Sequence, residues 1–353
     1  VYKRQSKTRV GSPLPENSRP ERPSVKNSAC FLLALLSPAV VGCGSEPSPD
    51  ATDSEVSPAH GMEAALPPGA QTLSLLGEPL FPPEASEDVR ARQTDQLEEA
   101  LANYEADPGS AEALIWVGRR EAYLGQYRIA IESFTTGVEL HPDDARFLRH
   151  RGHRYITLRE FDAAITDFEQ AVELVQGTED QVEPDGQPNA LGIPTSTLHF
   201  NIWYHYGLAH FLKGEFDEAI EKYRQCMAVS EHPDSKIATA HWLYMSLRRA
   251  GREEEAREFI QGMDLEGLAP DVIESGSYLA LLRIYRAGGA EREALEFGDL
   301  EGATQGYGHG NWALYNGDSE RAREIFQAIV AEKNQWGAFG YIAAEADLAR
   351  MGN

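Results

Sequence analysis

Four basic side chains fall at helical spacing within one short segment of the chain. Arg146, Arg149, His150 and His153 are spaced i, i+3, i+4 and i+7, so a helix would carry all four on one face. Residues 145–160 contain five Arg and one Glu, a local net charge of +4 in a chain whose net charge is -24. Such a cluster can hold carboxylates through charge-assisted hydrogen bonds. A solvated basic face neutralised by nearby acidic residues is the competing interpretation.

The other candidates for chemistry form no catalytic or metal-binding pattern. Ten His are present, but the sequence contains no HExxH motif, and no carboxylate or Cys completes a ligand set beside His150 and His153. No G-x-S-x-G nucleophile motif occurs. The glycine-rich run at 306–310 lacks the preceding strand that a phosphate-binding loop requires. We therefore expect no catalytic residue, no metal site and no cofactor.

Composition indicates a globular chain and excludes several functional classes. Of the 353 residues, 42% are hydrophobic and 25% are charged, which is typical of folded proteins. The 56 acidic residues outnumber the 32 basic ones, so we expect no nucleic acid as a partner, since phosphate binding needs an excess of Lys and Arg. Three Cys cannot build a disulfide framework.

The elements that must position the basic residues repeat at an interval of 34 residues. The pairs separated by this interval are Leu114 and Leu148, Gly118 and Gly152, Ala130 and Ala164, and Phe134 and Phe168. A fixed period of this size is typical of a solenoid built from helix pairs. The pattern resembles the tetratricopeptide repeat (TPR), whose signature combines a small residue in the first helix with Ala and an aromatic residue in the second.

The resemblance implies an all-α fold, a right-handed superhelical solenoid of TPR helix pairs with a disordered N-terminal segment. The repeat domain is expected to span 88–353. Clear repeats are expected at 111–178 and 200–263 and degenerate repeats at 271–334. Residues 336–351 are expected to form a capping helix.

An insertion at 177–198 separates the second and third repeats. Pro188, Gly192 and Pro194 exclude a continuous helix there. A long loop of this kind is either a binding element or a surface excursion, and the sequence leaves both interpretations open. A lead-in at 66–87 is expected to pack on the first helix.

The N-terminus is organised like an export signal. Residues 1–26 carry a net charge of +5, and an apolar run of 14 residues follows at 29–42, which is too short to span a membrane comfortably. The next residue is Cys43, and the run Val-Val-Gly-Cys resembles a bacterial lipobox. We therefore expect a signal peptide at 1–42, with Val25 as an alternative start.

Cleavage before Cys43 would leave a lipidated cysteine followed by a Pro-rich, acidic and flexible tether, together residues 43–87. Gly44 is not the Asp associated with inner-membrane retention. The expected location is therefore the bacterial cell envelope, as an outer-membrane lipoprotein that faces the periplasm or the surface. The competing interpretation is a cytoplasmic TPR adaptor with an accidental lipobox.

In TPR proteins the first helix of each repeat lines a concave groove, and this resemblance defines the candidate site. The groove residues implied by the repeat alignment are Arg119, Arg146, Arg149, His150, His153, Asn201, Tyr204, His205, His241 and Trp242. The resemblance to bacterial TPR-containing lipoproteins implies a membrane-tethered interaction scaffold that binds a protein or peptide partner. The basic lining favours an acidic segment or a C-terminal carboxylate. The alternative function is an enzyme, metal-dependent or with its site in the groove.

Overall fold

The computed structural model describes residues 66–288 and 302–352. The predicted signal peptide, Cys43 and most of the tether lie outside the described residues, as does 289–301 of the degenerate repeats. None of the described helices combines the length and the apolar character needed to cross a membrane.

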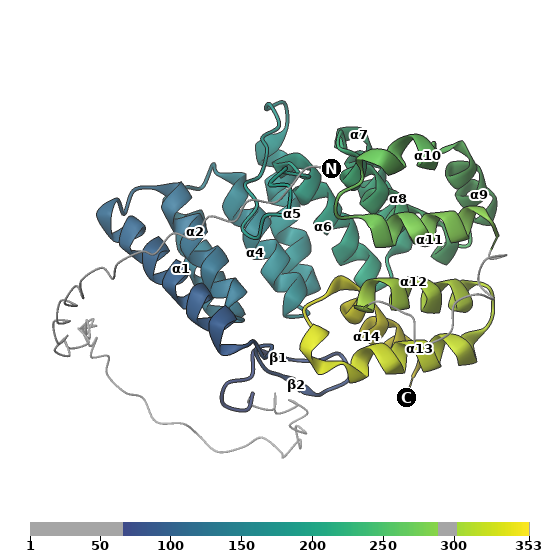
Figure 1. The fold of residues 1–353 in the computed structure, drawn as a ribbon, viewed down its shortest axis with the longest axis horizontal. Helices are drawn as coiled ribbons and strands as arrows, with labels where there is room; N and C mark the ends of the chain where they lie inside the picture. Colours follow the sequence, from purple (N-terminus) through teal and green to yellow (C-terminus); the bar gives the residue numbers. More distant parts are fainter. Residues whose placement is uncertain (1–65, 289–301, 353) are drawn as a thin grey trace, which may run out of the picture. The chain divides into compact units, whose positions relative to one another are not determined.

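The described part of the chain is built almost entirely of helices, which confirms the predicted all-α repeat fold (Figure 1). Consecutive helices pack as antiparallel neighbours along the chain. The helices are α1 (Glu87–Ala106), α2 (Ala111–Tyr123), α3 (Tyr127–Leu140), α4 (Ala145–Thr157), α5 (Phe161–Val175), α6 (Leu198–Lys213), α7 (Phe216–Val229), α8 (Pro233–Arg249), α9 (Glu253–Gly262), α10 (Leu265–Leu268), α11 (Gly276–Arg286), α12 (Gly302–Tyr315), α13 (Ser319–Ala331) and α14 (Phe339–Met351), with 3₁₀ turns η1 (Ala269–Asp271) and η4 (Lys333–Gln335). Two short antiparallel strands, β1 (Thr72–Leu73) and β2 (Pro79–Leu80), precede them.

Within a helix pair, a glycine of the first helix receives an aromatic ring of the second. A Cβ at this glycine would fall between 2.4 and 2.9 Å from the nearest ring carbon, so only a residue without a side chain permits this approach. The pairs are Gly118 with Phe134, Gly152 with Phe168, Gly207 with Tyr223, and Gly310 with Phe326. These contacts explain why glycine and an aromatic residue recur 16 positions apart in the repeats.

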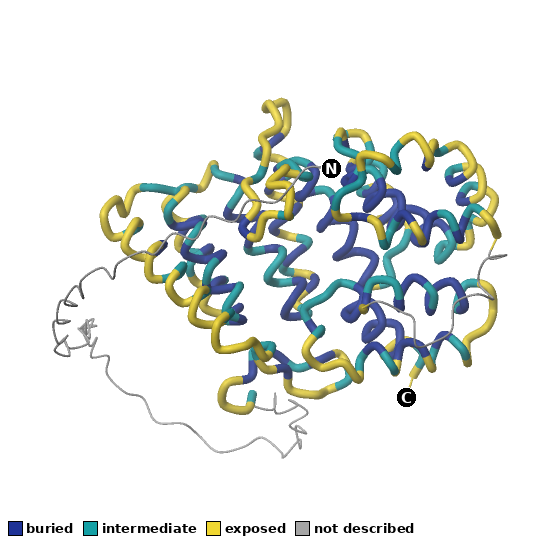
Figure 2. The backbone as a smooth tube through the Cα atoms, in the orientation of Figure 1, coloured by how far each residue is buried: buried dark blue, intermediate teal, exposed yellow. Residues whose placement is uncertain are grey.

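Burial increases from the N-terminal helix to the middle of the chain (Figure 2). In α1 only Ala100 is buried, whereas α6 and α8 are buried along most of their length. The difference arises because α14 contacts α6, and α11 contacts α8, in addition to the helices that adjoin α6 and α8 in the sequence. The third repeat is therefore covered by helices from both sides.

The turn between α4 and α5 carries an arginine where other repeats have glycine. Gly125, Gly214, Gly251 and Gly317 end the first helix of their repeats with φ between 74 and 89°. Arg159 occupies the equivalent place in the second repeat with φ 68°. A left-handed conformation costs a residue with a Cβ about 1–2 kcal/mol, so this arginine is held there by other interactions.

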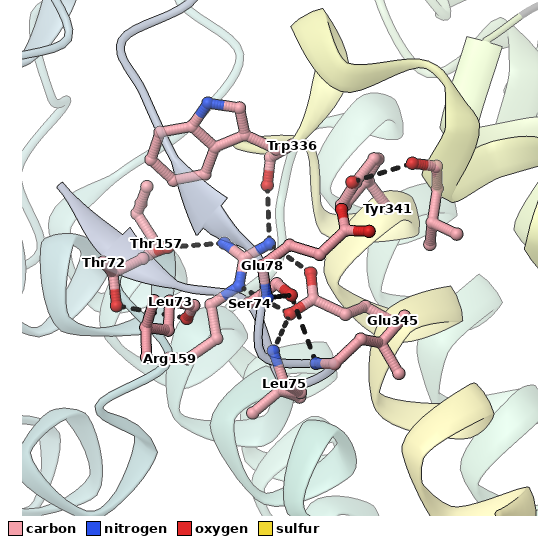
Figure 3. A network of polar contacts seen from close by, with 12 residues as sticks. Thr72, Leu73, Ser74, Leu75, Glu78, Thr157, Arg159, Trp336, Tyr341 and Glu345 are labelled. Atoms are coloured by element: carbon pink, nitrogen blue, oxygen red, sulfur yellow. Dashed lines mark hydrogen bonds and ion pairs between the residues drawn. The ribbon is translucent and has the colours of Figure 1, made fainter. Parts of the chain in front are cut away.

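Those interactions centre on a buried ion pair between Arg159 and Glu345 (Figure 3). Arg159 Nη2 lies 2.5 Å from Glu345 Oε2, and the two side chains are only 3% and 1% exposed. The guanidinium also donates to the carbonyl oxygens of Thr157, at 2.5 Å, and Trp336, at 3.0 Å. It stacks over the Trp336 ring at 5.3 Å. The α4–α5 turn is thus joined to α14 and to the segment before it.

The lead-in joins the same network. Thr72 Oγ1 donates to the Leu158 carbonyl at 2.8 Å, and the Leu75 amide donates to Glu345 (Figure 3). Trp336 Nε1 donates to the Phe81 carbonyl at 2.6 Å. We expected the lead-in to pack on the first helix. Its hydrogen bonds instead run to the α4–α5 turn, to the C-terminal segment and to Arg128 at the start of α3, which donates to Gln71. Backbone groups beside the two strands, such as the Leu75 amide and the Phe81 carbonyl, find their partners in the C-terminal segment.

A second buried carboxylate on α14 binds α8 and α12. Asp347 lies 2.8 Å from Arg249 and 2.7 Å from Arg350, and it accepts a hydrogen bond from Tyr307 at 2.9 Å. Burial alone raises the pKa of Asp347, but Arg249 and Arg350 outweigh it, so the net pKa lies below the usual 3.8. The helix that we expected to cap the last repeat therefore anchors α8, α12 and the α4–α5 turn through two buried acids.

We predict that Glu345→Gln destabilises the fold strongly. The substitution keeps the shape of the side chain but leaves the buried Arg159 charge without its partner, which costs about 3–5 kcal/mol. The midpoint and slope of urea unfolding, followed by circular dichroism, measure this loss. Glu98→Gln on the exposed part of α1 is the matched control and should change the free energy of unfolding by less than about 0.5 kcal/mol. Equal losses in the two variants would contradict a structural role for the ion pair.

Candidate functional site

A pocket of about 320 Å³ lies where α2, α3 and α4 meet the insertion. Its basic wall consists of Arg119 from α2 and of Arg149, His150, His153 and Arg154 from α4. We call this site the arginine–histidine pocket. The opposite wall contains residues 183–187 and 195–196 of the insertion, with Glu274 at the rim before α11.

Helical spacing explains how the basic wall forms. In α4, the four basic residues occupy two successive turns, at i, i+1, i+4 and i+5, so their side chains leave the helix on one side. Arg119 lies near the end of α2, where its guanidinium stacks over the Trp116 ring at 4.3 Å. Its Nη2 also donates to Tyr123 Oη at 3.5 Å. The neighbouring repeat thereby adds a third arginine to the wall.

The insertion closes one side of the pocket. Glu183 Oε2 lies 2.8 Å from Arg149 Nε and accepts a hydrogen bond from Asn201 Nδ2 at 3.2 Å. Arg120 donates to the Gly186 carbonyl at 3.2 Å, and a Cβ at Gly186 would lie 2.0 Å from Tyr123 Oη. The insertion is therefore packed closely against the first two repeats rather than projecting wholly into solvent.

Two of the three arginines in the pocket lack an acidic partner. No carboxylate within the described ranges lies at ion-pair distance from Arg119 or Arg154. Burial, together with the charges of Arg149 and Arg119, lowers the pKa of Arg154 to about 10, although two tyrosines act in the opposite direction. Burial likewise lowers the pKa of Arg149, and Glu183 offsets part of this effect. Three carboxylates also line the pocket, those of Glu183, Asp185 and Glu274, but only Glu183 lies at ion-pair distance from one of the arginines, Arg149.

The histidines beside these arginines are neutral at physiological pH. Burial, and then the neighbouring arginine charges, hold the pKa values of His150, His153 and His205 well below 6.5. The His153 and His205 rings lie 4.4 Å apart, and His205 Nδ1 donates to the Asn201 carbonyl at 2.6 Å. Arg149 Nη1 donates to His150 Nδ1 at 3.0 Å, which requires an unprotonated ring nitrogen. The positive charge of the pocket therefore comes from arginine alone.

The structure brings together only part of the predicted groove. Arg119, Arg149, His150 and His153 line one pocket. Arg146 does not join them, because its guanidinium pairs with Glu112 at 2.6 Å and with Asp144 at 2.7 Å. The four residues predicted to share one face from their i, i+3, i+4 and i+7 spacing therefore do not all line the pocket. Arg146 extends toward acidic groups outside it.

Asn201 and His205 are buried behind the basic wall, where they contact Glu183 and His153 rather than line the pocket themselves. Their position corrects the prediction that α6 contributes groove residues. The covering residue is Phe339 of α14, whose ring lies 5.4 Å from His153 and 5.5 Å from His205.

The predicted groove residues of the third and fourth repeats lie in the hydrophobic core. Trp242 and His241 are each 1% exposed, and Trp242 Nε1 donates to Tyr204 Oη at 2.8 Å. Tyr278 of α11 covers this region, with its ring 4.6 Å from His241 and its Oη 3.4 Å from Tyr204. The chain's own later helices therefore occupy the space where repeat alignment places a groove.

Two further residues of the pocket were not identified from the sequence. Arg154 belongs to the basic segment, but it falls outside the i, i+3, i+4, i+7 pattern. Glu183 is one of several acidic residues of the insertion, and only its contact with Arg149 distinguishes it. Among the described residues, no group of three or more His, Cys, Asp and Glu side chains is arranged to hold a metal ion.

Comparison with known proteins identifies the repeats. Two family models, both described as tetratricopeptide repeat, match residues 117–179 and 200–232. These residues form the helices that carry the arginine–histidine pocket and the third repeat. Residues 117–179 and 200–232 are therefore tetratricopeptide repeats.

Individual relatives are distant. The chain is 28% identical over 140 residues to a bovine (Bos taurus) protein, BBSome complex member BBS4; the match covers 40% of this chain and 23% of that protein, so it spans about a quarter of the relative. A solved tetratricopeptide repeat protein from Parabacteroides merdae is 15% identical and covers 73% of this chain and 98% of its own, with a TM-score of 0.43. YrrB, titled a TPR protein with an unusual peptide-binding site, is 14% identical and covers 67% of this chain and 92% of its own, with a TM-score of 0.38.

We predict that the neutral histidines make the fold sensitive to mild acid. Their pKa values are lower in the folded than in the unfolded chain, so the unfolded chain alone gains protons as the pH falls below about 6.5. Stability is therefore complete above that pH and declines below it, by about 1.4 kcal/mol per pH unit for each such histidine. Urea unfolding between pH 7.5 and 5.5 measures the slope. His153→Gln should reduce the slope by about one proton, and an unchanged slope would contradict the prediction.

Proposed function

We propose that this protein is a membrane-tethered scaffold that binds an acidic segment, or the C-terminal carboxylate, of a protein partner in the arginine–histidine pocket. Tetratricopeptide-repeat proteins use the surfaces of their stacked helices to bind other proteins and peptides. The bovine relative is named as a member of a multiprotein complex, which is compatible with an assembly role. The proposed tether is the lipid-modified Cys43 followed by the flexible acidic segment.

One observation carries the ligand class: Arg119 and Arg154 line a pocket in which no described carboxylate pairs with them. A guanidinium offers parallel N–H donors that match the two oxygens of a carboxylate. A volume of about 320 Å³ suits a side chain or a chain end rather than a folded element. An acidic group from a partner would form the ion pair that Arg119 and Arg154 lack within the described residues.

We predict that Arg119→Gln combined with Arg154→Gln weakens binding of an acidic peptide at least tenfold. Each substitution removes charge-assisted hydrogen bonds worth about 1.5–3 kcal/mol. The melting temperature should stay the same or rise, because the double variant no longer buries two uncompensated charges. Fluorescence polarisation with a labelled hexaglutamate peptide measures the Kd. A native partner is sought by affinity capture from membranes with residues 44–353 as bait.

Arg146→Gln is the control for this experiment. It removes an arginine from the same helix, but one that is paired with Glu112 and Asp144 outside the pocket. Its Kd should remain within about twofold of the wild-type value, as expected for an exposed ion pair. The proposed function would be wrong if the double variant bound hexaglutamate as tightly as the control.

The proposed lipid modification of Cys43 gives a separate prediction. Cys43→Ala should abolish labelling of the chain by radioactive palmitate and leave the uncleaved precursor, because acylation at this cysteine precedes cleavage in lipoproteins. The variant should also move from the detergent phase to the aqueous phase in a phase-partition assay, since loss of the acyl chains removes the anchor. A wild-type chain that takes up no palmitate would contradict the lipid anchor but not the peptide-binding site.

A further inference from the structure

The pocket already contains a carboxylate, and it belongs to the chain itself. Glu183 reaches into it from the insertion, with its side chain 11% exposed. Its Oε2 lies 2.8 Å from Arg149 Nε, and its Oε1 lies 4.0 Å from His150 Nε2. Asn201 Nδ2 donates to the same Oε2 at 3.2 Å. Glu183 thus occupies the position at Arg149 that an acidic group from a partner would take.

The contact between Glu183 and Arg149 is incomplete. Although the distance is that of an ion pair, the buried Nε–H of Arg149 makes no hydrogen bond within the described part of the chain. A carboxylate approaching a guanidinium side-on satisfies Nε–H and one terminal N–H together. Arg149 is only 7% exposed, so water does not readily replace the missing acceptor. The pair therefore leaves a donor available to a better-placed carboxylate.

The backbone around Glu183 is held independently of its side chain. The Glu183 amide donates to the Ser196 carbonyl at 3.2 Å, and the Leu198 amide donates to the Gln181 carbonyl at 2.8 Å. On the other side, the Gly186 carbonyl accepts from Arg120. Rotation of the Glu183 side chain toward solvent would leave all three hydrogen bonds in place. The carboxylate can therefore leave Arg149 without displacement of the insertion.

We propose that Glu183 is an internal ligand of the arginine–histidine pocket, and that a partner's carboxylate displaces it from Arg149. The inference rests on the proposed function, since it assumes that acidic groups bind this pocket. Only the fraction of molecules with Glu183 turned away offers Arg149 to a partner, so the apparent Kd equals the intrinsic Kd divided by that fraction. Glu183 therefore determines how strongly acidic a partner must be in order to bind.

The test compares Glu183→Gln with Glu179→Gln. Both variants remove one negative charge from the insertion, but Glu179 is exposed, lies outside the pocket and forms no ion pair or hydrogen bond with an arginine of the pocket. With labelled hexaglutamate as the probe, Glu183→Gln should bind at least fivefold more tightly than Glu179→Gln, and Glu179→Gln should remain close to the wild type. An affinity of Glu183→Gln equal to or below that of Glu179→Gln would overturn the proposal.

A measurement on the wild-type chain covers the case in which Glu183→Gln does not fold. The ¹⁵N–¹H signal of Arg149 Nε should shift when hexaglutamate is added, because this donor gains an acceptor. Binding of the peptide without any shift of that signal would overturn the exchange at Arg149 while leaving the proposed function intact. Absence of hexaglutamate binding to the wild type and to both variants would instead remove the proposed function itself.

Discussion

The arrangement of the helices depends on the buried ion pair between Arg159 and Glu345. It joins residues that are 186 positions apart, whereas repeats of an ordinary solenoid contact only their sequence neighbours. Because α14 is thereby held beside the α4–α5 turn, Phe339 packs against His153 and His205 and covers the front of the third repeat. The part of the predicted groove that stays open therefore lies in the first two clear repeats, where the arginine–histidine pocket is found.

The repeat fold could be predicted from the sequence because its packing is local and periodic. A glycine in one helix meets a ring in the next, as Gly152 meets Phe168, and this contact recurs in four helix pairs of the described chain. The ion pair between the α4–α5 turn and α14 has no such period. One signal for it was present: Arg159 stands where aligned repeats have glycine, and a left-handed arginine needs a compensating interaction. The sequence alone does not say which carboxylate provides it.

The candidate site was predictable only as far as repeat alignment reaches. Helical spacing identified Arg149 and His150, and the repeat offset added Arg119. The same alignment placed Trp242 in a groove, but Tyr278 and its helix cover that region through contacts that no repeat pattern encodes. Repeat alignment thus predicts which residues share a surface where the array is open, and it fails where later parts of the chain fold back on it.

The charge of the pocket follows from burial more than from the number of basic residues. His150 and His153 count as basic in the sequence, yet desolvation keeps them neutral, so three arginines supply all of the charge. The chain as a whole has a net charge of -24 and repels acidic partners at long range. The attraction between an acidic partner and the arginines must therefore act within a few ångströms of the pocket. At that range little water intervenes, so the electrostatic attraction is stronger and salt screens it least. In so small a volume, a single carboxylate such as Glu183 pairs with one of the three arginines and leaves the other two without an ion pair.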